Sequence, residues 1–333
     1  MKKLLILLGL FLALSNPAEG AFSIFTGSYT GDGNDNRSIS GIGFQGDWML
    51  VFPDDGEEVT HRNSTNTGDA TQFFASTGAD FADGIQKFEA DGFELGTSIV
   101  VNQCGIVYYF TVFKFDNTTS NTGSYTGDNS DNRNLAIVGF DPTYVVIAGE
   151  VGGRTKNQRS ASNATDDSMF FGPTSHSANH IQDFITNGFQ IGSIGAVNKG
   201  GETFFNESFL NITNGFTEGT YTGDGNNGRS VSVGFRPLLV IVKQDGGTDA
   251  AGRNDAFADG EGKRFDTEGV TANGVQNFET DGFTLGSTNK VNGLGLLYNF
   301  MAWKSPPSAV SRNVFLTQYE PDELFQSYRT EGM

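Results

Sequence analysis

Three copies of one Gly- and Asp-rich stretch lie along the chain at an interval of 96 residues. They read TGSYTGDGNDNRSISGIGF at 26–44, TGSYTGDNSDNRNLAIVGF at 122–140 and EGTYTGDGNNGRSVSVGF at 218–235. A second stretch closes each repeat: IQKFEADGFELG from Ile85, IQDFITNGFQIG from Ile181 and VQNFETDGFTLG from Val275. Solenoid units, at roughly 20–50 residues, cannot bury their own apolar faces. A repeat of 96 residues is long enough to be a domain with its own core.

The composition favours β-structure with many turns. The 333 residues include 45 glycines and 30 phenylalanines. Each repeat has a short, nearly continuous apolar run: DWMLVF at 47–52, TYVVIA at 143–148 and LLVIVK at 238–243. Such runs are typical of core strands that are covered on both faces. Each repeat then ends on a further strand, at 105–114, 202–210 and 294–304.

Each repeat also carries a hairpin signal. An Asp-Gly or Asn-Gly pair separates a strand-like segment from an alternating apolar segment: Asp91-Gly92, Asn187-Gly188 and Asp281-Gly282. These pairs adopt positive φ at both central positions of a two-residue turn. We therefore expect them to form the hairpin turns themselves.

These patterns predict an all-β fold of three tandem, antiparallel, jelly-roll-like β-sandwiches. The expected divisions are a signal peptide at 1–20, repeats at 21–116, 117–212 and 213–304, and a C-terminal tail at 305–333. The connections between repeats are short and polar, so the units are expected to behave as beads held close together. In the tail, VFLTQY at 314–319 has strand character, and Pro321 suits the first position of a short helix.

The N-terminal segment has the layout of a secretory signal peptide. Lys2 and Lys3 precede an apolar stretch at 4–14, and a small-residue frame ends at Gly20. We expect cleavage after Gly20 and a secreted protein, extracellular or at the cell surface, with no membrane insertion after cleavage. The formal charge of −18 repels phosphate groups, so nucleic acid is not expected as a partner.

The repeats combine variants of GSYTGDG, a following Arg and Gly-Phe with later variants of DGF-x-LG and Val-Asn. This combined signature resembles an uncharacterised repeat domain of secreted bacterial proteins and phage tail-associated proteins. The resemblance covers residues 26–304. It implies surface exposure and a β-sandwich, and it implies no reaction. This chain departs from the pattern after the Gly-Phe, where Gly46-Asp47, Asp141-Pro142 and Arg236-Pro237 vary the usual Pro-Asp.

The Asp- and Asn-rich loops have two interpretations. As connections between strands, their Gly, Asn and Asp residues tolerate left-handed backbone, and Arg37 pairs with carboxylates of its own loop. As calcium sites, they would supply oxygen ligands from Asp32, Asn34, Asn36, Asp128, Asp224 and Asn226. No bidentate Glu follows at the EF-hand distance, and an arginine flanks each loop. We expect structural loops without a cofactor, with calcium as the alternative.

Other candidates for chemistry do not recur in all repeats. The four-residue spacing of His176 and His180 would suit zinc on a helix, but the surrounding GPTSHSANH is rich in turn residues. The other histidine is His61, and Cys104 is the single cysteine, expected to be a small apolar core residue. With no recurring base and no nucleophile motif, we do not expect an enzyme.

The sequence thus favours a non-enzymatic surface or extracellular structural protein. Its units would pack on one another or on other surface proteins, and its tail would serve in capping or assembly. The alternative is a multivalent carbohydrate-binding or adhesion protein, calcium-dependent or not, that holds glycans on exposed aromatic side chains and polar loops. A hydrolase is the weakest interpretation, because paired carboxylates are expected by chance in so acidic a chain.

Overall fold

A computed structural model describes residues 21–78 and 80–305 of the chain. Their regular structure consists of 24 strands and two short helices. The strands form three similar units of antiparallel sheets, and the predicted all-β fold with three tandem repeats is therefore confirmed. The expected signal peptide at 1–20 and the tail segments at 314–319 and 321–329 lie outside the described residues.

Each unit contains eight strands in the same order. Unit 1 consists of β1 (Ser23–Thr30), β2 (Arg37–Ser40), β3 (Trp48–Pro53), β4 (Thr60–Asn63), β5 (Gln72–Phe73), β6 (Ile85–Glu89), β7 (Gly92–Leu95), α1 (Ile99–Asn102) and β8 (Val107–Lys114). Unit 2 consists of β9 (Ser120–Thr126), β10 (Arg133–Leu135), β11 (Tyr144–Gly149), β12 (Asn157–Ser160), β13 (Met169–Phe170), β14 (Ile181–Ile185), β15 (Gly188–Ile191), α2 (Gly195–Asn198) and β16 (Thr203–Phe209). Unit 3 consists of β17 (Phe216–Thr222), β18 (Arg229–Ser232), β19 (Leu239–Gln244), β20 (Ala251–Asn254), β21 (Lys263–Arg264), β22 (Val275–Glu279), β23 (Gly282–Leu285) and β24 (Leu297–Trp303).

Two sheets face each other in every unit. In unit 1 the five-stranded sheet has the order β1-β8-β3-β4-β5, and the three-stranded sheet has the order β2-β7-β6. The first strand thus pairs with the last and the second with the seventh, a nested, jelly-roll-like pairing. Side chains of both sheets meet in the unit's own core, where Met49 and Val51 of β3 join Phe93 and Leu95 of β7.

The predicted hairpins are present, but the glycine is not in the turn. Glu89 of β6 pairs with Gly92 of β7, so the two turn residues are Ala90 and Asp91. Gly92 begins the strand, and a Cβ added there would lie 1.9 Å from the carbonyl oxygen of Ile39. The equivalent glycines meet the same obstacle at 1.9 Å: Gly188 at Leu135 and Gly282 at Val231. The expectation of positive φ at both residues of the pair is therefore wrong, since the glycine is needed for close approach of β2.

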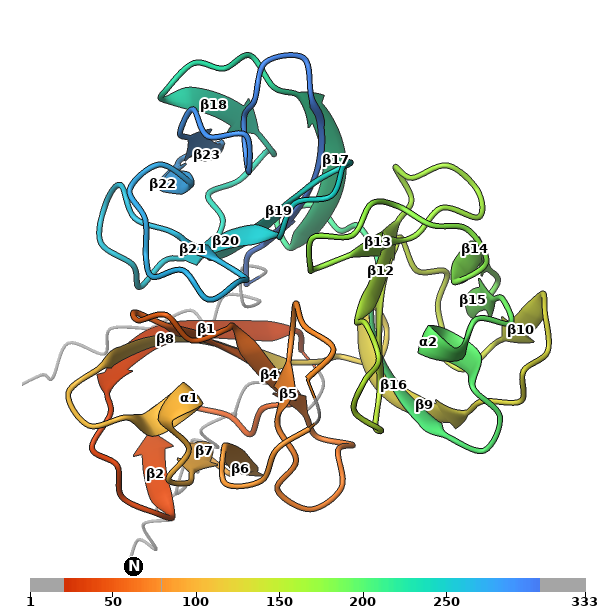
Figure 1. Cartoon of the computed structure of the whole chain (residues 1–333), viewed down its shortest axis with the longest axis horizontal. Helices are drawn as coiled ribbons and strands as arrows, with labels where there is room; N and C mark the ends of the chain where they lie inside the picture. Colours follow the sequence, from red (N-terminus) through yellow and green to blue (C-terminus); the bar gives the residue numbers. More distant parts are fainter. Residues whose placement is uncertain (1–20, 79, 306–333) are drawn as a thin grey trace, which may run out of the picture.

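The apolar strands are covered on both faces, as their sequences predict. All six residues of β3 are buried. While Met49 and Val51 point into the core of unit 1, Trp48, Leu50 and Phe52 belong to a second cluster on the opposite face of the sheet. The five-stranded sheets of all units turn this face toward the centre of the molecule (Figure 1).

This second cluster, here called the axial core, is built by all three units. Its aromatic members that are at most 1% exposed are Trp48, Phe52, Phe74, Phe113, Tyr144, Phe171, Phe209, Phe265 and Trp303. Equivalent residues meet in triangles: ring centroids are 4.2, 5.4 and 5.8 Å apart among Phe74, Phe171 and Phe265. They are 5.9, 5.9 and 5.6 Å apart among Phe113, Phe209 and Trp303. The expected beads on short linkers are instead parts of one body with a shared core.

The units also contact one another in a ring. Unit 1 reaches unit 2 where Gln72 Nε2 donates to the carbonyl of Gly149 at 2.7 Å. Unit 3 reaches unit 2 where Lys243 Nζ donates to the carbonyl of Thr174 at 3.4 Å. It reaches unit 1 where Lys263 Nζ donates to the carbonyl of Asp55 at 3.0 Å. We call these three contacts the 1–2, 2–3 and 3–1 junctions.

The ends of the described chain are close together. The backbone N–H of Ile24 donates to Ser305 Oγ at 3.0 Å, and Ser305 Oγ donates back to the carbonyl of Ile24 at 2.9 Å. The first strand of unit 1 and the end of unit 3 are thus joined directly. Within the described part, no helix has both the length and the apolar character that crossing a membrane requires.

Candidate functional site

The repeated Asp- and Asn-rich loop is fixed to an asparagine that follows the second repeated stretch. In unit 1 this is Asn102, the last residue of α1, which is fully buried. Its Oδ1 accepts from the backbone N–H of Asp32 and from Arg37 Nη1, both at 3.1 Å. Its Nδ2 donates to the carbonyls of Asn34 at 2.8 Å and Gly96 at 2.9 Å. The side-chain amide therefore joins the two repeated stretches.

Arg37 holds the loop from its other side. Its Nη1 also donates to the carbonyl of Thr30 at 2.7 Å, and its Nε lies 3.4 Å from the Asp32 carboxylate. The guanidinium carbon lies 5.4 Å from the centroid of the Tyr29 ring, a cation–π geometry. The Tyr29 hydroxyl in turn donates to the carbonyl of Val101 at 2.7 Å. The expected pairing of Arg37 with a carboxylate of its own loop is present.

The same arrangement recurs in the other units. Asn198 and Asn292 are fully buried in the place of Asn102. The arginines again face the loop aspartates, Arg133 with Asp128 at 3.2 Å and Arg229 with Asp224 at 3.9 Å. The signature is repeated because each unit needs the same tyrosine, arginine and asparagine to fix this loop.

The aspartates among the calcium candidates, Asp32, Asp128 and Asp224, already accept hydrogen bonds from the protein. Asp32 Oδ1 accepts from the backbone N–H of Asn34 at 2.9 Å, and this bond holds the pKa of Asp32 below its usual value. The backbone N–H of Asn36, at φ 56°, donates to Asp35 at 2.8 Å. In the other units the bonds are from Ser130 to Asp128 at 2.8 Å and from Asn226 to Asp224 at 2.9 Å. In each unit, an aspartate carboxylate thus caps the turn of its own loop.

His176 and His180, which are four residues apart in the sequence, lie in different surroundings. The segment 171–180 contains no helix, so their four-residue spacing does not place them on one face. His180 packs edge-on against Phe170, with centroids 5.1 Å apart, and burial lowers the pKa of its ring. His61 is buried beside Trp48, and burial holds its pKa well below the usual value.

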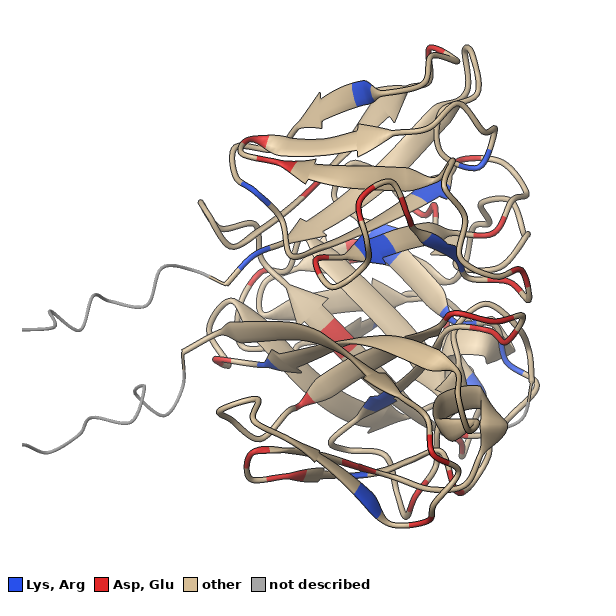
Figure 2. Ribbon diagram, turned by 90° about the vertical axis from the view of Figure 1, so that its left-hand side faces the viewer, with Lys and Arg blue, Asp and Glu red and all other residues tan. Residues whose placement is uncertain are grey.

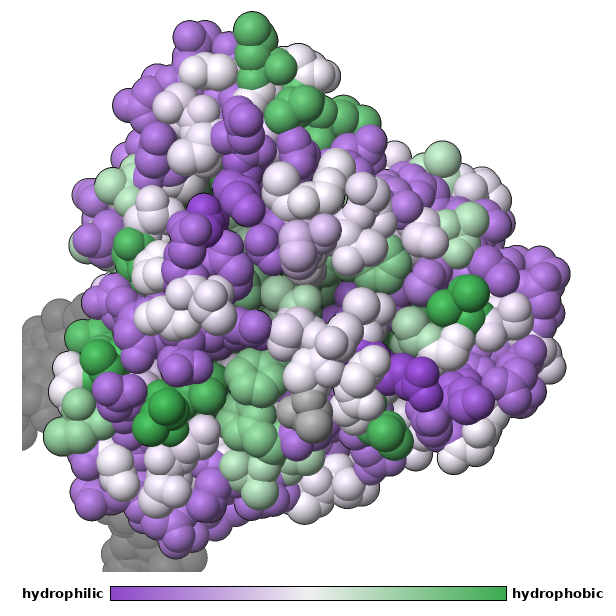
Figure 3. Space-filling view, viewed as in Figure 1, coloured by the Kyte–Doolittle hydropathy of each residue, from purple (hydrophilic) through white to green (hydrophobic). Residues whose placement is uncertain are grey.

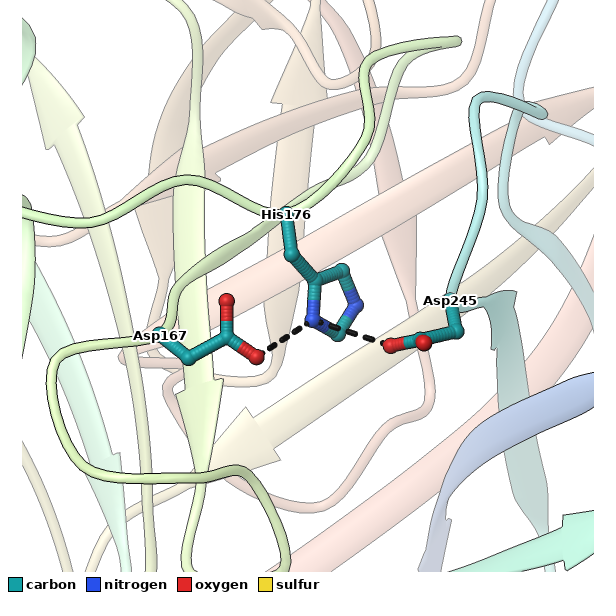
Figure 4. A group of neighbouring side chains, drawn as sticks. All are labelled: Asp167, His176 and Asp245. Carbon is teal, nitrogen blue, oxygen red and sulfur yellow. Dashed lines mark hydrogen bonds and ion pairs between the residues drawn. The ribbon is translucent and has the colours of Figure 1, made fainter.

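His176 instead meets two carboxylates at the 2–3 junction (Figure 4). Its Nδ1 lies 2.8 Å from Oδ2 of Asp167, which precedes β13, and 3.0 Å from Oδ1 of Asp245, which follows β19. The His176 side chain is only 11% exposed, compared with 31% for Asp167 and 46% for Asp245. Its Nε2 is buried and has no hydrogen-bond partner among the described residues. The ring therefore makes its polar contacts through Nδ1.

Sequence reasoning found only one member of this group. Asp167 and Asp245 are 78 residues apart and belong to no repeated motif. One signal was available: an acidic residue directly follows the central apolar strand in every unit, as Asp54, Glu150 and Asp245. Which side chains lie opposite this acidic residue depends on how the three units are arranged around the axis of the molecule.

Cys104 is also placed differently from the prediction. It is exposed in the loop between α1 and β8, and so it is not a core residue. The equivalent positions carry Gly200 and Leu294, and Leu294 is exposed as well.

No family model, curated protein or solved structure matches the chain. The resemblance to a repeat domain of secreted and phage tail-associated proteins therefore stays a prediction.

Proposed function

We propose that the protein is a non-enzymatic structural protein of the cell surface or extracellular space, in which three β-sandwich units act as one rigid body. The observation that supports this most is the axial core. Phe74, Phe171 and Phe265 are each fully buried against residues of other units. A shared aromatic core resists relative motion of the units, as a structural element requires.

Assembly through the C-terminal tail is part of this proposal. The tail follows Ser305, which hydrogen bonds to Ile24 beside the start of unit 1. A partner held by the tail would thus be attached at one defined place on the body. We place the contact with other copies or other surface proteins there.

The surface of the described residues is mostly polar, as expected for a protein body that is surrounded by water. Acidic residues are spread over the loops of the units in Figure 2. On the face viewed in Figure 3, apolar residues form separate small areas between hydrophilic ones. Scattered apolar residues are normal for a protein surface, whereas docking faces are usually continuous apolar patches.

The glycan-binding alternative gains no support from the aromatic residues. It requires exposed rings on which sugars stack, but every Phe, Tyr and Trp in 21–78 and 80–305 is buried or half-buried. The exposed large apolar residues in this part are aliphatic, such as Ile99, Val151 and Leu294.

One cavity among the described residues has the size of a small-ligand pocket. It has a volume of about 310 Å³ and lies where the connection from unit 2 enters unit 3. Its lining includes Asn211, Ile212, Phe216 and Phe235, and it contains no carboxylate, histidine, lysine or cysteine. The hydroxyl groups of Thr213 and Thr217 in the lining have no lining histidine, lysine or carboxylate beside them that could activate them as nucleophiles.

Tail truncation tests the proposal. We would compare the chain from residue 21 to 333 with a form ending at Ser305, which keeps the bond to Ile24, and with a form whose tail sequence is scrambled. Light scattering coupled to gel filtration should show self-association, or capture of a surface partner, only with the native tail. Equal mass and equal partner capture for all three forms would overturn assembly through the tail. Saturable binding on a glycan array would overturn the structural assignment.

A further inference from the structure

We propose that Asp167, His176 and Asp245 bind one divalent transition-metal ion, best matched by zinc, which links unit 2 to unit 3. The three side chains present one ring nitrogen and two carboxylate oxygens, all within 4.8 Å of one another. Two ligands come from loops of unit 2 and the third from unit 3, so the ion would lie in the 2–3 junction (Figure 4).

Hydrogen bonding alone leaves this group unsatisfied. Nδ1 of His176 carries at most one proton, yet carboxylate oxygens lie at 2.8 and 3.0 Å from it. One N–H cannot be directed well at both oxygens. A cation placed between the three atoms would interact with all of them and would offset two negative charges.

Lys243 acts on Asp245 electrostatically, but its hydrogen bonds go to backbone carbonyls. Lys243 Nζ donates to the carbonyls of Gln244 at 3.0 Å and Gly246 at 2.8 Å, in addition to Thr174. Its ammonium thus holds the loop that carries Asp245, and no hydrogen bond joins it to that carboxylate among the described residues.

The type of donor selects the metal. Imidazole and carboxylate together suit zinc and neighbouring transition metals, whereas calcium takes about six to eight oxygen ligands. Around a tetrahedral zinc with bonds of about 2.0–2.2 Å, ligand atoms lie roughly 3.3–3.5 Å apart. The two nitrogen–oxygen separations of 2.8 and 3.0 Å would widen by about half an ångström, a small movement for side chains on loops. Asp245 is partly exposed, which leaves room for a water molecule as a fourth ligand.

The other two junctions indicate that one ion binds per chain. The bridges Thr71–Phe81, Ser168–Ser177 and Gly262–Thr271 align the three loops, so Asp80 and Val270 occupy the place of His176. At the 1–2 junction Asp80 faces Glu150, and at the 3–1 junction Asp54 faces Glu261. Paired carboxylates recur, but the imidazole is present only at the 2–3 junction.

Metal titration of the full chain tests the site. Untagged protein, first dialysed against a chelator, would be titrated with Zn²⁺ by calorimetry and with Co²⁺ by visible absorption. We expect one equivalent of Zn²⁺, and intense d–d bands from four-coordinate Co²⁺. His176→Ala and Asp245→Asn should each weaken Zn²⁺ binding by at least about tenfold, since each removes a direct ligand. Zn²⁺ should raise the melting temperature of the native chain but not of either variant.

Asp259→Asn is the matched control for Asp245→Asn. Both lie in unit 3, but the Asp259 side chain is 98% exposed, so its replacement should leave Zn²⁺ affinity unchanged. The Asp245 side chain is half-exposed on a loop, so Asp245→Asn should still fold. This variant therefore tests the site even if His176→Ala does not fold. The proposal is wrong if the native chain binds none of these ions, or if Asp245→Asn binds them as tightly as Asp259→Asn does.

Discussion

The rings of Phe74 and Phe171 lie 4.2 Å apart between centroids and nearly perpendicular, at 84°. The two residues come from different units, directly after β5 and β13, and both are fully buried. Phe265, after β21, packs against both. The packing around each of these phenylalanines is therefore completed by the equivalent residues of the other two units.

Replacing Phe171 by alanine should destabilise the whole body rather than unit 2 alone. The substitution leaves a cavity at the axis, where no single unit can close it, so we expect a loss of about 3–5 kcal/mol. Calorimetric or denaturant unfolding of the native chain should show one transition, which moves as a whole in the variant. Val151→Ala, at a half-exposed site in the same unit, should change the free energy of unfolding by less than about 0.5 kcal/mol. Separate transitions for the three units would contradict the shared core.

Gly92→Ala should destabilise unit 1 through a steric clash. The new Cβ would lie 1.9 Å from the carbonyl oxygen of Ile39, so β2 must move and its pairing with β7 must weaken. We expect a cost of about 1–3 kcal/mol or more in denaturant unfolding. Gly274→Ala is the control, because its Cβ would meet its nearest neighbour, in Thr271, at 3.8 Å. Equal effects of the two substitutions would disprove the close approach.

Asn102→Ala should cost more stability than Arg37→Ala. The buried amide of Asn102 has four partners, and each partner left unsatisfied costs about 1–3 kcal/mol unless water reaches it. The Arg37 side chain is 22% exposed, and its pair with Asp32 contributes about 0–1 kcal/mol. Chemical denaturation of both variants gives the comparison. A larger loss for Arg37→Ala would mean that the arginine, and not the asparagine, fixes the loop.

Glu207 should make stability fall as pH rises. Burial raises the pKa of Glu207 from 4.5 to about 8, so the folded state keeps a proton that the unfolded chain has lost. Between these two pKa values the free energy of unfolding should decrease by up to about 1.4 kcal/mol per pH unit, and above the folded-state pKa this contribution levels off. Glu207→Gln should remove this slope, because glutamine can still accept the 2.7 Å bond from Asn63 Nδ2.

The measurement is denaturant unfolding from pH 5 to 9 for the native chain, Glu207→Gln and Glu279→Gln. Glu279 is exposed in unit 3, so its variant should keep the native slope. Taking differences between variants separates this group from others that titrate, such as Asp80, whose pKa burial raises to about 6. Parallel curves for all three proteins would show that Glu207 is ionised in the folded state.

Local patterns in the sequence were sufficient for the units themselves. The period-2 pattern in the last strand predicts that Leu296, Tyr298, Phe300 and Ala302 share a face. Tyr298, Phe300 and Ala302 lie in the core of unit 3, whereas Leu296 is exposed just before β24 begins. The continuous apolar runs predict strands covered on both faces, and β3, β11 and β19 are fully buried. These features depend on side-chain alternation and burial within about a dozen residues, which a single sequence displays directly.

What covers the second face could not be predicted in the same way. Trp48 and Trp303 are apolar whether a neighbouring unit or a separate partner buries them, so the axial core leaves no distinct local signal. The group around His176 depends on the same long-range packing, because Asp245 reaches it only through the ring of units. The prediction for the turn at Gly92 was wrong for another reason. The Asp-Gly preference describes an isolated hairpin, whereas here a third strand, β2, approaches so closely that only glycine fits.

The three junctions also fix a copy number. Every unit contacts one neighbour through one surface and the other neighbour through a second surface. The contact of Lys263 with unit 1 closes the ring from the third unit back to the first. A repeating contact that closes on itself offers no vacant end at which a fourth unit could be added. A fourth unit added by gene duplication would therefore find no free junction, and any assembly of this protein with further copies would have to use a different surface.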